Sequence, residues 1–281
     1  MERSHVLQLS GSDVRHLHFS YCVHLPFLAG LSYDALAFLS VIRLSYLHTI
    51  IYPQLHLSIR KNCTLHSICY TAVCKQNCMN TDDRTEKLKS IRDEVINLTE
   101  SPLYEYRQEN NYLPVIGEGA HDADIMFIGE APGKNEAQTG RPFCGAAGDI
   151  LNEMLDHIDL DRDTVYITNI IKDRPPENRD PTTEEVEVYS PFLDRQIEII
   201  DPEIIVTLGR HAMEYILEKL GLTDQMEKIS DAHGSTYTAD GLFGAMTVIP
   251  LYHPAVATYN PNEKETLLED MTVIKSALDK S

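Results

Sequence analysis

Short apolar runs alternate with longer amphipathic segments over most of the chain. Nearly continuous apolar runs are typical of buried strands, and they occur at residues 124–129, 165–171, 204–209 and 245–251. Apolar residues spaced three and four apart predict helices at residues 148–158, 183–199, 210–220 and 263–278. This alternation predicts an α/β fold, a three-layer αβα sandwich around a central four-stranded parallel sheet.

The first 78 residues differ in composition from the rest. They hold five of the six cysteines and seven of the twelve histidines, and bases outnumber acids there. The whole chain of 281 residues carries 43 acidic and 24 basic side chains, a net charge of −19. Met79 begins a stretch with an ordinary helix start. We therefore predict an N-terminal extension at residues 1–78, either a poorly ordered appendage or a start-site artefact, and one domain at residues 79–281.

Four cysteines lie close together in this extension, at positions 63, 69, 74 and 78. Their spacing differs from the paired cysteines of common zinc sites, so unpaired thiols are favoured over a metal site. Their uneven placement also argues against a secreted disulfide framework, which leaves a reducing, cytoplasmic setting as the expectation. No stretch is apolar for long enough to predict a membrane span.

Unusual residues collect where the predicted strands end, which is where parallel sheets bind ligands. Residues 129–145 form a Gly-rich stretch after the first strand, Asn169 lies near the end of the second strand, and His253 follows the last. The glycine spacing is not that of a P-loop. Taken singly, Phe143 is typical of a loop anchor, Asn169 of a turn residue and His253 of a structural histidine.

Taken together, five blocks resemble family 4 of the uracil-DNA glycosylase superfamily over residues 85–278. In chain order they are GEAPGKNE, TGRPFCGAAG, VYITNIIKDRPPENRDPT, LG followed by Ala212, and YHPAVATYNP. The resemblance implies a monomeric DNA-repair enzyme that acts on DNA containing uracil and hydrolyses the N-glycosidic bond after flipping the base into a pocket. Two alternatives stay open, a non-catalytic uracil- or damaged-DNA-binding protein and, by fold analogy, an enzyme acting on a small nucleotide.

The resemblance implies a role for each of three pocket side chains. Phe143 would stack on the face of the flipped uracil. The Asn169 amide would accept from uracil N3–H and donate to O4, and cytosine would mismatch both contacts. His253 would donate to uracil O2, where negative charge accumulates as the bond breaks.

The Gly-rich loop is expected to supply the rest of the base pocket. Gly129, Ala131 and Gly133 would bind substrate through their backbones. The best-known family of the superfamily has an aspartate where this chain has Ala131, so the water-activating carboxylate is missing there. Glu130 and Glu136 are the nearby carboxylates, and we assign both to catalysis, with Glu136 favoured for water or sugar.

Bases near the strand ends predict a narrow cationic strip on an otherwise acidic body, which would contact DNA. Besides Lys134, the strip contains Arg141, Lys172, Arg174, Arg179 and Arg210. Thr258 stands where the family usually carries a larger aliphatic residue that fills the gap left by the flipped base. We therefore include Thr258 among the DNA contacts. Because its side chain is smaller, we expect it to insert less firmly into the gap left by the flipped base.

The same resemblance implies a four-iron cluster held by four cysteines, and this chain departs from it. Alignment on the Pro-Leu pair and on the block after the Asn strand places the ligand positions at Leu98, Ser101, Asp173 and Tyr189. Iron-sulfur clusters require thiolates, and Cys144 is the only cysteine between residues 79 and 281. The sequence therefore predicts no cluster and no other metal cofactor in this domain.

Overall fold

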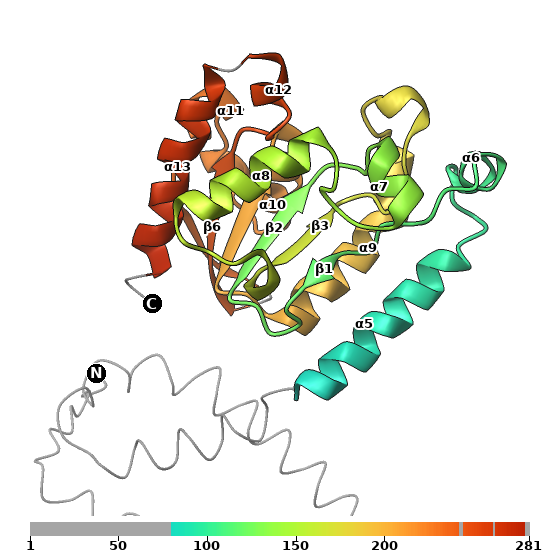
Figure 1. Cartoon of the computed structure of the whole chain (residues 1–281). Helices are drawn as coiled ribbons and strands as arrows, with labels where there is room; N and C mark the ends of the chain where they lie inside the picture. Colours follow the sequence, from blue (N-terminus) through green and yellow to red (C-terminus); the bar gives the residue numbers. More distant parts are fainter. Residues whose placement is uncertain (1–79, 242–243, 261, 279–281) are drawn as a thin grey trace, which may run out of the picture. The chain divides into compact units, whose positions relative to one another are not determined.

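The computed structural model of the chain describes residues 80–241, 244–260 and 262–278 (Figure 1). The predicted extension lies outside these residues, so its nature stays a prediction. The described part contains a six-stranded sheet with the strand order β1-β3-β2-β4-β6-β5. The strands are β1 (Glu118–Gly119), β2 (Ile125–Gly129), β3 (Tyr166–Asn169), β4 (Ile204–Leu208), β5 (Tyr237–Gly241) and β6 (Gly244–Leu251).

The four central strands β3, β2, β4 and β6 run parallel, which confirms the predicted parallel sheet. Two antiparallel strands extend it: β1 pairs with β3 on one edge and β5 with β6 on the other. These two edge strands are not among the predicted elements. β1 has only two residues, too few for a periodic pattern to indicate.

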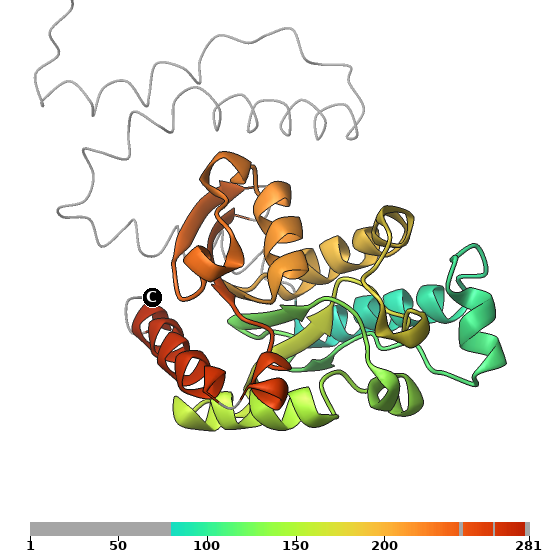
Figure 2. The same ribbon diagram turned by 90° about the horizontal axis from the view of Figure 1, so that it is seen from above.

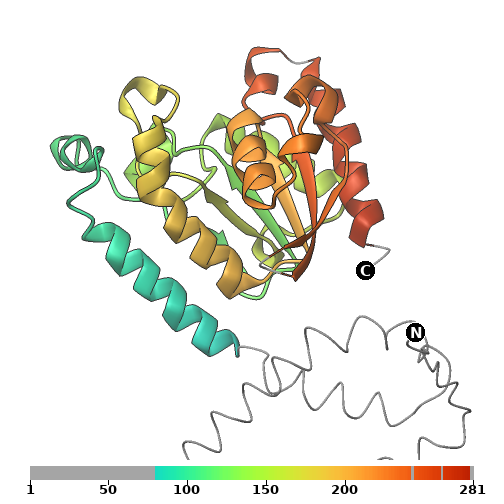
Figure 3. The same ribbon diagram turned by 180° about the vertical axis from the view of Figure 1, so that it is seen from behind.

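Helices cover both faces of the sheet, as Figures 2 and 3 show. One face packs against α8 and α13, and the other against α9 and α10, while α5 packs against α9. The longer helices are α5 (Thr81–Ile96), α8 (Ala146–His157), α9 (Thr183–Ile200), α10 (Arg210–Lys219) and α13 (Glu263–Leu278). The shorter ones are α6 (Tyr104–Glu109), α7 (Lys134–Thr139), α11 (Ile229–Ala232) and α12 (Val256–Tyr259). This arrangement is the predicted three-layer sandwich.

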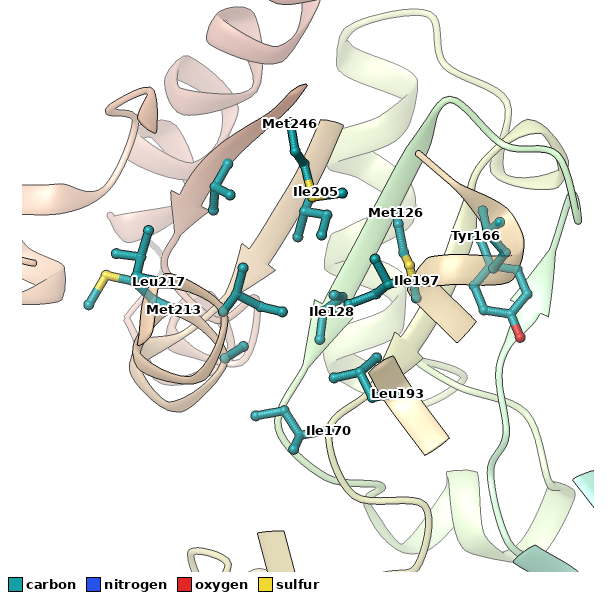
Figure 4. Packing of buried hydrophobic residues seen from close by; sticks show 14 of the residues in the cluster. Met126, Ile128, Tyr166, Ile170, Leu193, Ile197, Ile205, Met213, Leu217 and Met246 are labelled. Atoms are coloured by element: carbon teal, nitrogen blue, oxygen red, sulfur yellow. The ribbon is translucent and has the colours of Figure 1, made fainter. Parts of the chain in front are cut away.

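The strands are apolar on both faces because each face is covered by helices. In β2, Ile125 and Phe127 join the core under α8 and α13, whereas Met126 and Ile128 point to the opposite core. Figure 4 shows Met126 and Ile128 packed beside Ile197 of α9. Each such side chain contributes roughly 1.5–3 kcal/mol when it is fully buried.

Local sequence signals set the ends of α9. The Thr182 side chain accepts from the backbone N–H of Glu185, whose carboxylate accepts from the Thr182 N–H in return. This capping box satisfies two donors that a helix start leaves free. At the other end Asp201 adopts a left-handed conformation that stops the helix. No helix in the described ranges has the length and apolar character needed to cross a bilayer.

Candidate active site

A pocket of about 360 Å³ lies beyond the carboxyl ends of the parallel strands. Adjacent strands bring its residues together, since Gly129 at the end of β2 pairs in register with Asn169 at the end of β3. His253 follows β6 by two residues. The lining comprises Glu130, Ala131, Pro132, Gly133, Glu136, Phe143, Ala147, Asn169, Pro175, Asn178, Arg179, Asp180, His253, Ala255 and Tyr259. The three predicted base-binding side chains therefore converge on one cavity.

Phe143 is held in the pocket wall by two close backbone approaches. Its own φ of 45° is left-handed, and a Cβ on Gly148 would lie 2.0 Å from the Phe143 carbonyl oxygen. A Cβ on Gly129 would lie 2.7 Å from the Phe143 ring. Both glycines are therefore required for the ring position. The ring stacks on His253 with the centroids 5.6 Å apart and the planes 30° apart.

Asn169 presents an unpaired acceptor in the pocket. Asn169 is 2% exposed, and its Oδ1 is buried and accepts no hydrogen bond from the described residues. An unsatisfied buried acceptor costs about 1–3 kcal/mol, which a ligand N–H would recover. The Asn169 main-chain carbonyl accepts from Lys172 Nζ at 2.7 Å, which fixes the backbone beneath the amide.

His253 is a neutral imidazole with a defined tautomer. Its Nδ1 accepts the backbone N–H of Ala255 at 3.2 Å, so the ring proton belongs on Nε2. Although the pocket leaves part of the residue accessible, desolvation of the ring lowers the pKa of His253 to about 4, opposed by the charge of Glu136. Near neutral pH the ring can therefore donate from Nε2 to a pocket ligand.

Glu136 organises the loop that carries Phe143. Its Oε1 accepts the backbone N–H groups of Cys144 at 3.0 Å and Gly145 at 2.9 Å. A Cβ on Gly133 would lie 2.6 Å from its Oε2. The loop that carries Phe143 therefore folds around the Glu136 carboxylate. The positions of these residues in the sequence do not indicate this contact. The predicted role in holding water or sugar stays a prediction.

Glu130 lies in a cluster that the sequence analysis missed. Its carboxylate is 3.8 Å from His211 Nε2, which in turn lies 3.2 Å from the Asp180 carboxylate. Burial raises the pKa of Glu130, an effect that His211 opposes. The three groups could hold a cation by their donor types, with ligand atoms within 4.8 Å of one another. His211 and Asp180 come from α10 and from the loop before α9, so no local motif marked them.

The predicted cationic strip is only partly available for DNA. Arg141 pairs with Glu118 at 2.7 Å, Arg179 with Glu185 at 2.6 Å, and Arg210 lies 3.7 Å from Asp180. Arg141 and Arg210 remain more than half exposed. Each pair lowers the local positive charge.

Lys172 does not belong to the cationic strip that the sequence predicts. It is fully buried and donates to Thr168 Oγ1, the Asn169 carbonyl and Gln196 Oε1 at 2.5–2.8 Å. Burial lowers its pKa well below the ordinary lysine value. Such a group cannot reach a phosphate, so the expected DNA contact is wrong for this residue.

Arg174 forms hydrogen bonds within the protein, whereas Lys134 is exposed to solvent. The Arg174 guanidinium donates to the hydroxyls of Tyr106 and Tyr112 and to Asn178. Lys134 is exposed at the start of α7. Neither residue forms an ion pair with a carboxylate within the described residues, but Arg174 is held by its three hydrogen bonds. Lys134 therefore stays the most available cation of the predicted set.

The helix after His253 places a different side chain at the pocket mouth from the one expected. The Thr258 hydroxyl donates to the Ala255 carbonyl at 2.7 Å. Tyr259, one residue further on, is 89% exposed and lines the pocket. A large exposed aromatic ring at a pocket rim is suited to stack on a nucleobase. The sequence indicated the loop but not which of its residues projects.

Comparisons with known proteins agree with this site. A family model for the uracil DNA glycosylase superfamily matches residues 116–272. A type-4 uracil-DNA glycosylase of Sulfurisphaera tokodaii is 47% identical over 191 residues, 68% of this chain and 84% of that protein. One of Archaeoglobus fulgidus is 42% identical over 189 residues, 67% and 92% respectively. A type-5 enzyme of Pyrobaculum aerophilum is 32% identical over 204 residues, 66% and 84%.

The chain belongs to the uracil DNA glycosylase superfamily and, within it, to the type-4 family. The resemblance identified from the sequence is therefore confirmed. The family's iron-sulfur cluster does not fit the residues at its expected positions. Leu98 and Ser101 follow α5, Asp173 follows β3, and Tyr189 lies in α9, but the set offers hydrocarbon and oxygen instead of thiolate. Cys144, the cysteine within the described residues, lies in the Phe143 loop instead.

Proposed function

We propose that this chain is a DNA glycosylase that hydrolyses the bond between uracil N1 and deoxyribose C1′, releasing uracil and leaving an abasic site. The observation that carries the proposal is the convergence of Phe143, Asn169 and His253 on one cavity. Their chemistry matches a flat pyrimidine with an N–H and two carbonyl oxygens. The names of the type-4 relatives support the same substrate.

Base selection follows from the unpaired Asn169 acceptor. Uracil brings an N3–H donor to this oxygen, which removes its desolvation cost. Cytosine brings a lone pair at N3 and a donor at the neighbouring exocyclic position, so both contacts become repulsive. Sites that hydrogen-bond a ligand in this way reject the mismatched analogue strongly, because buried polar groups stay unpaired.

Bond breaking is assisted by the neutral His253 ring. The N1–C1′ electron pair leaves with uracil, and negative charge grows on O2. A fixed Nε2–H donor in the pocket stabilises that charge. Water then bonds to C1′ through its oxygen, and its proton ends on the released uracil. Glu136 and Glu130 are the carboxylates we assign to steadying the cationic sugar and this water.

DNA is the proposed partner, held by exposed cations around the pocket and by the Tyr259 ring. The acidic body makes this contact local, so binding should weaken steeply with salt. We also propose that the enzyme acts as a monomer and in the cytoplasm. Sedimentation of the purified chain tests the first of these, and fractionation of the source cells tests the second.

The test uses the full chain and an end-labelled oligonucleotide with one uracil. Alkali after incubation should cleave at the uracil position, and an oligonucleotide with cytosine there should stay intact. Asn169→Ala should lose at least about a hundredfold in kcat/KM, because an acceptor that the substrate requires is removed. Asn110→Ala changes an exposed amide at the end of α6 and should leave activity unchanged. Tight binding of the uracil oligonucleotide without alkali-labile product would instead favour the non-catalytic binding protein.

A further inference from the structure

The turn between α5 and α6 contacts the segment after β3 and helix α9 through buried polar groups. Tyr189 donates its hydroxyl hydrogen to Asp173 Oδ2 at 2.6 Å. Because that hydrogen is committed, the 2.6 Å contact between Ser101 Oγ and Tyr189 Oη has serine as the donor. Ser101 Oγ also accepts from the Leu103 N–H. A directed chain of hydrogen bonds therefore runs from Ser101 through Tyr189 to Asp173.

Arg107 of α6 completes this chain. Its NH1 group donates to Asp173 Oδ2 at 2.9 Å and to the Val95 carbonyl at 3.1 Å, and its NH2 group donates to the Ile96 carbonyl. The last turn of α5 contains no basic residue of its own. The guanidinium therefore caps the negative end of α5 and neutralises Asp173 at the same time.

The network is closed to solvent, and its two opposite charges are paired with each other. Arg107 is 3% exposed and Asp173 1%, and the Tyr189 side chain is completely buried. Burial raises the pKa of Asp173, whereas the Tyr189 hydroxyl and the Arg107 charge lower it. No buried side-chain polar atom of these residues lacks a hydrogen-bond partner. A buried charge pair of this kind holds its two segments together, because removing one member leaves the charge of the other buried and unpaired.

Three of these positions, Ser101, Asp173 and Tyr189, are ones where the family pattern calls for cluster cysteines. We propose that the hydrogen-bonded set Ser101, Tyr189, Asp173 and Arg107 replaces the iron-sulfur cluster, so that this enzyme folds without iron. The set joins α5 and α6 to Asp173. Two residues further along the chain, Pro175 lines the pocket. The proposal concerns how the site is supported and does not depend on the reaction.

Two measurements on the full chain test the replacement. The first is iron content after anaerobic purification with iron-supplemented expression. We expect no stoichiometric iron and no absorbance near 400 nm, and about four irons per chain would overturn the proposal. The second is a double-mutant cycle between Ser101→Ala and Tyr189→Phe, read by the midpoint of urea unfolding. Both are small truncations that keep the apolar packing, so the variants should fold.

The expected result is strong coupling between the two substitutions. Tyr189→Phe should lower the urea midpoint clearly, and Ser101→Ala should lower it less in that background than in the wild type, because only the contact with the Leu103 N–H is then left to lose. Tyr215→Phe is the matched control, since the Tyr215 hydroxyl donates to Asp194 at 2.7 Å outside the network. Its effect should add to that of Ser101→Ala. Additive behaviour of Ser101→Ala with Tyr189→Phe as well would overturn the network.

Hydrogen exchange locates the effect within the fold. In Tyr189→Phe the amides of α5 should exchange faster, because the helix is less firmly held, while those of β2 and β4 should keep their protection. A uniform loss of protection across α5, β2 and β4 would show general destabilisation in place of a local fastening, and would count against the proposal.

Discussion

Replacing His253 tests two consequences of its desolvated imidazole, one for the rate of bond cleavage and one for the pH dependence of stability. In His253→Gln the side chain keeps a hydrogen-bond donor but cannot titrate. At neutral pH the native ring is uncharged with its proton on Nε2, because burial lowers its pKa to about 4. The glutamine amide differs in shape from the imidazole, so its N–H does not lie where the His253 Nε2–H is aimed at the developing charge on uracil O2. We expect kcat to fall about 10²–10³-fold, the usual loss for one such donor.

The same substitution changes how stability depends on pH. The pKa of His253 is about 4 when folded and 6.5 in its ordinary state. Between these values the unfolded chain binds a proton that the folded chain does not, so stability falls as pH drops from about 6.5 to 4. The penalty from this residue is roughly 2 kcal/mol at pH 5 and nearly zero at pH 7.

Urea unfolding at pH 7 and pH 5 measures this penalty. The wild type should lose about 2 kcal/mol more than His253→Gln over that range. His157→Gln, at the exposed end of α8, should behave like the wild type. Equal pH dependence in the wild type and His253→Gln would refute the desolvated-imidazole reasoning, even if the rate falls as expected.

Three further substitutions test other parts of the site. Burial lowers the pKa of Lys172, so wild-type stability should rise with pH toward the ordinary lysine value by up to about 1.4 kcal/mol per unit, and Lys172→Met should lose this rise in urea unfolding. Tyr259→Ala should lower kcat/KM on duplex DNA by about 5- to 150-fold in a glycosylase assay, since base stacking contributes roughly 1–3 kcal/mol. Lys134→Gln should weaken DNA binding for all sequences and reduce the salt slope by about one, measured by titration at several salt concentrations.

Matched variants define the outcomes that would contradict these expectations. Lys228, exposed and away from the pocket, is the control for both lysines. A pH-dependent rise retained in Lys172→Met, or an unchanged salt slope in Lys134→Gln, would contradict the burial and charge arguments. Tyr259→Phe keeps the ring and should keep the activity. If it loses as much as Tyr259→Ala, stacking is not the role of this residue.

The local pattern of the chain determined most of the fold. Four apolar runs specified the parallel strands because buried strands need side chains apolar on both faces, and the capping box at Thr182 fixed the start of α9. Motif order placed Asn169 at the end of one strand, His253 just after another, and Phe143 in the segment that follows a third. Parallel strands carry their carboxyl ends to one edge, so these residues had to meet.

Only the tertiary structure decided which polar residues face solvent. Lys172 sits in a motif rich in bases, yet its nitrogen reaches Gln196, 24 positions away, inside the core. Ser101 and Tyr189 are 88 positions apart and nevertheless share a hydrogen bond. Sequence periodicity reports contacts within one helix or strand, whereas these pairs depend on how separate elements pack. The pairing of distant polar groups is therefore set by the fold as a whole.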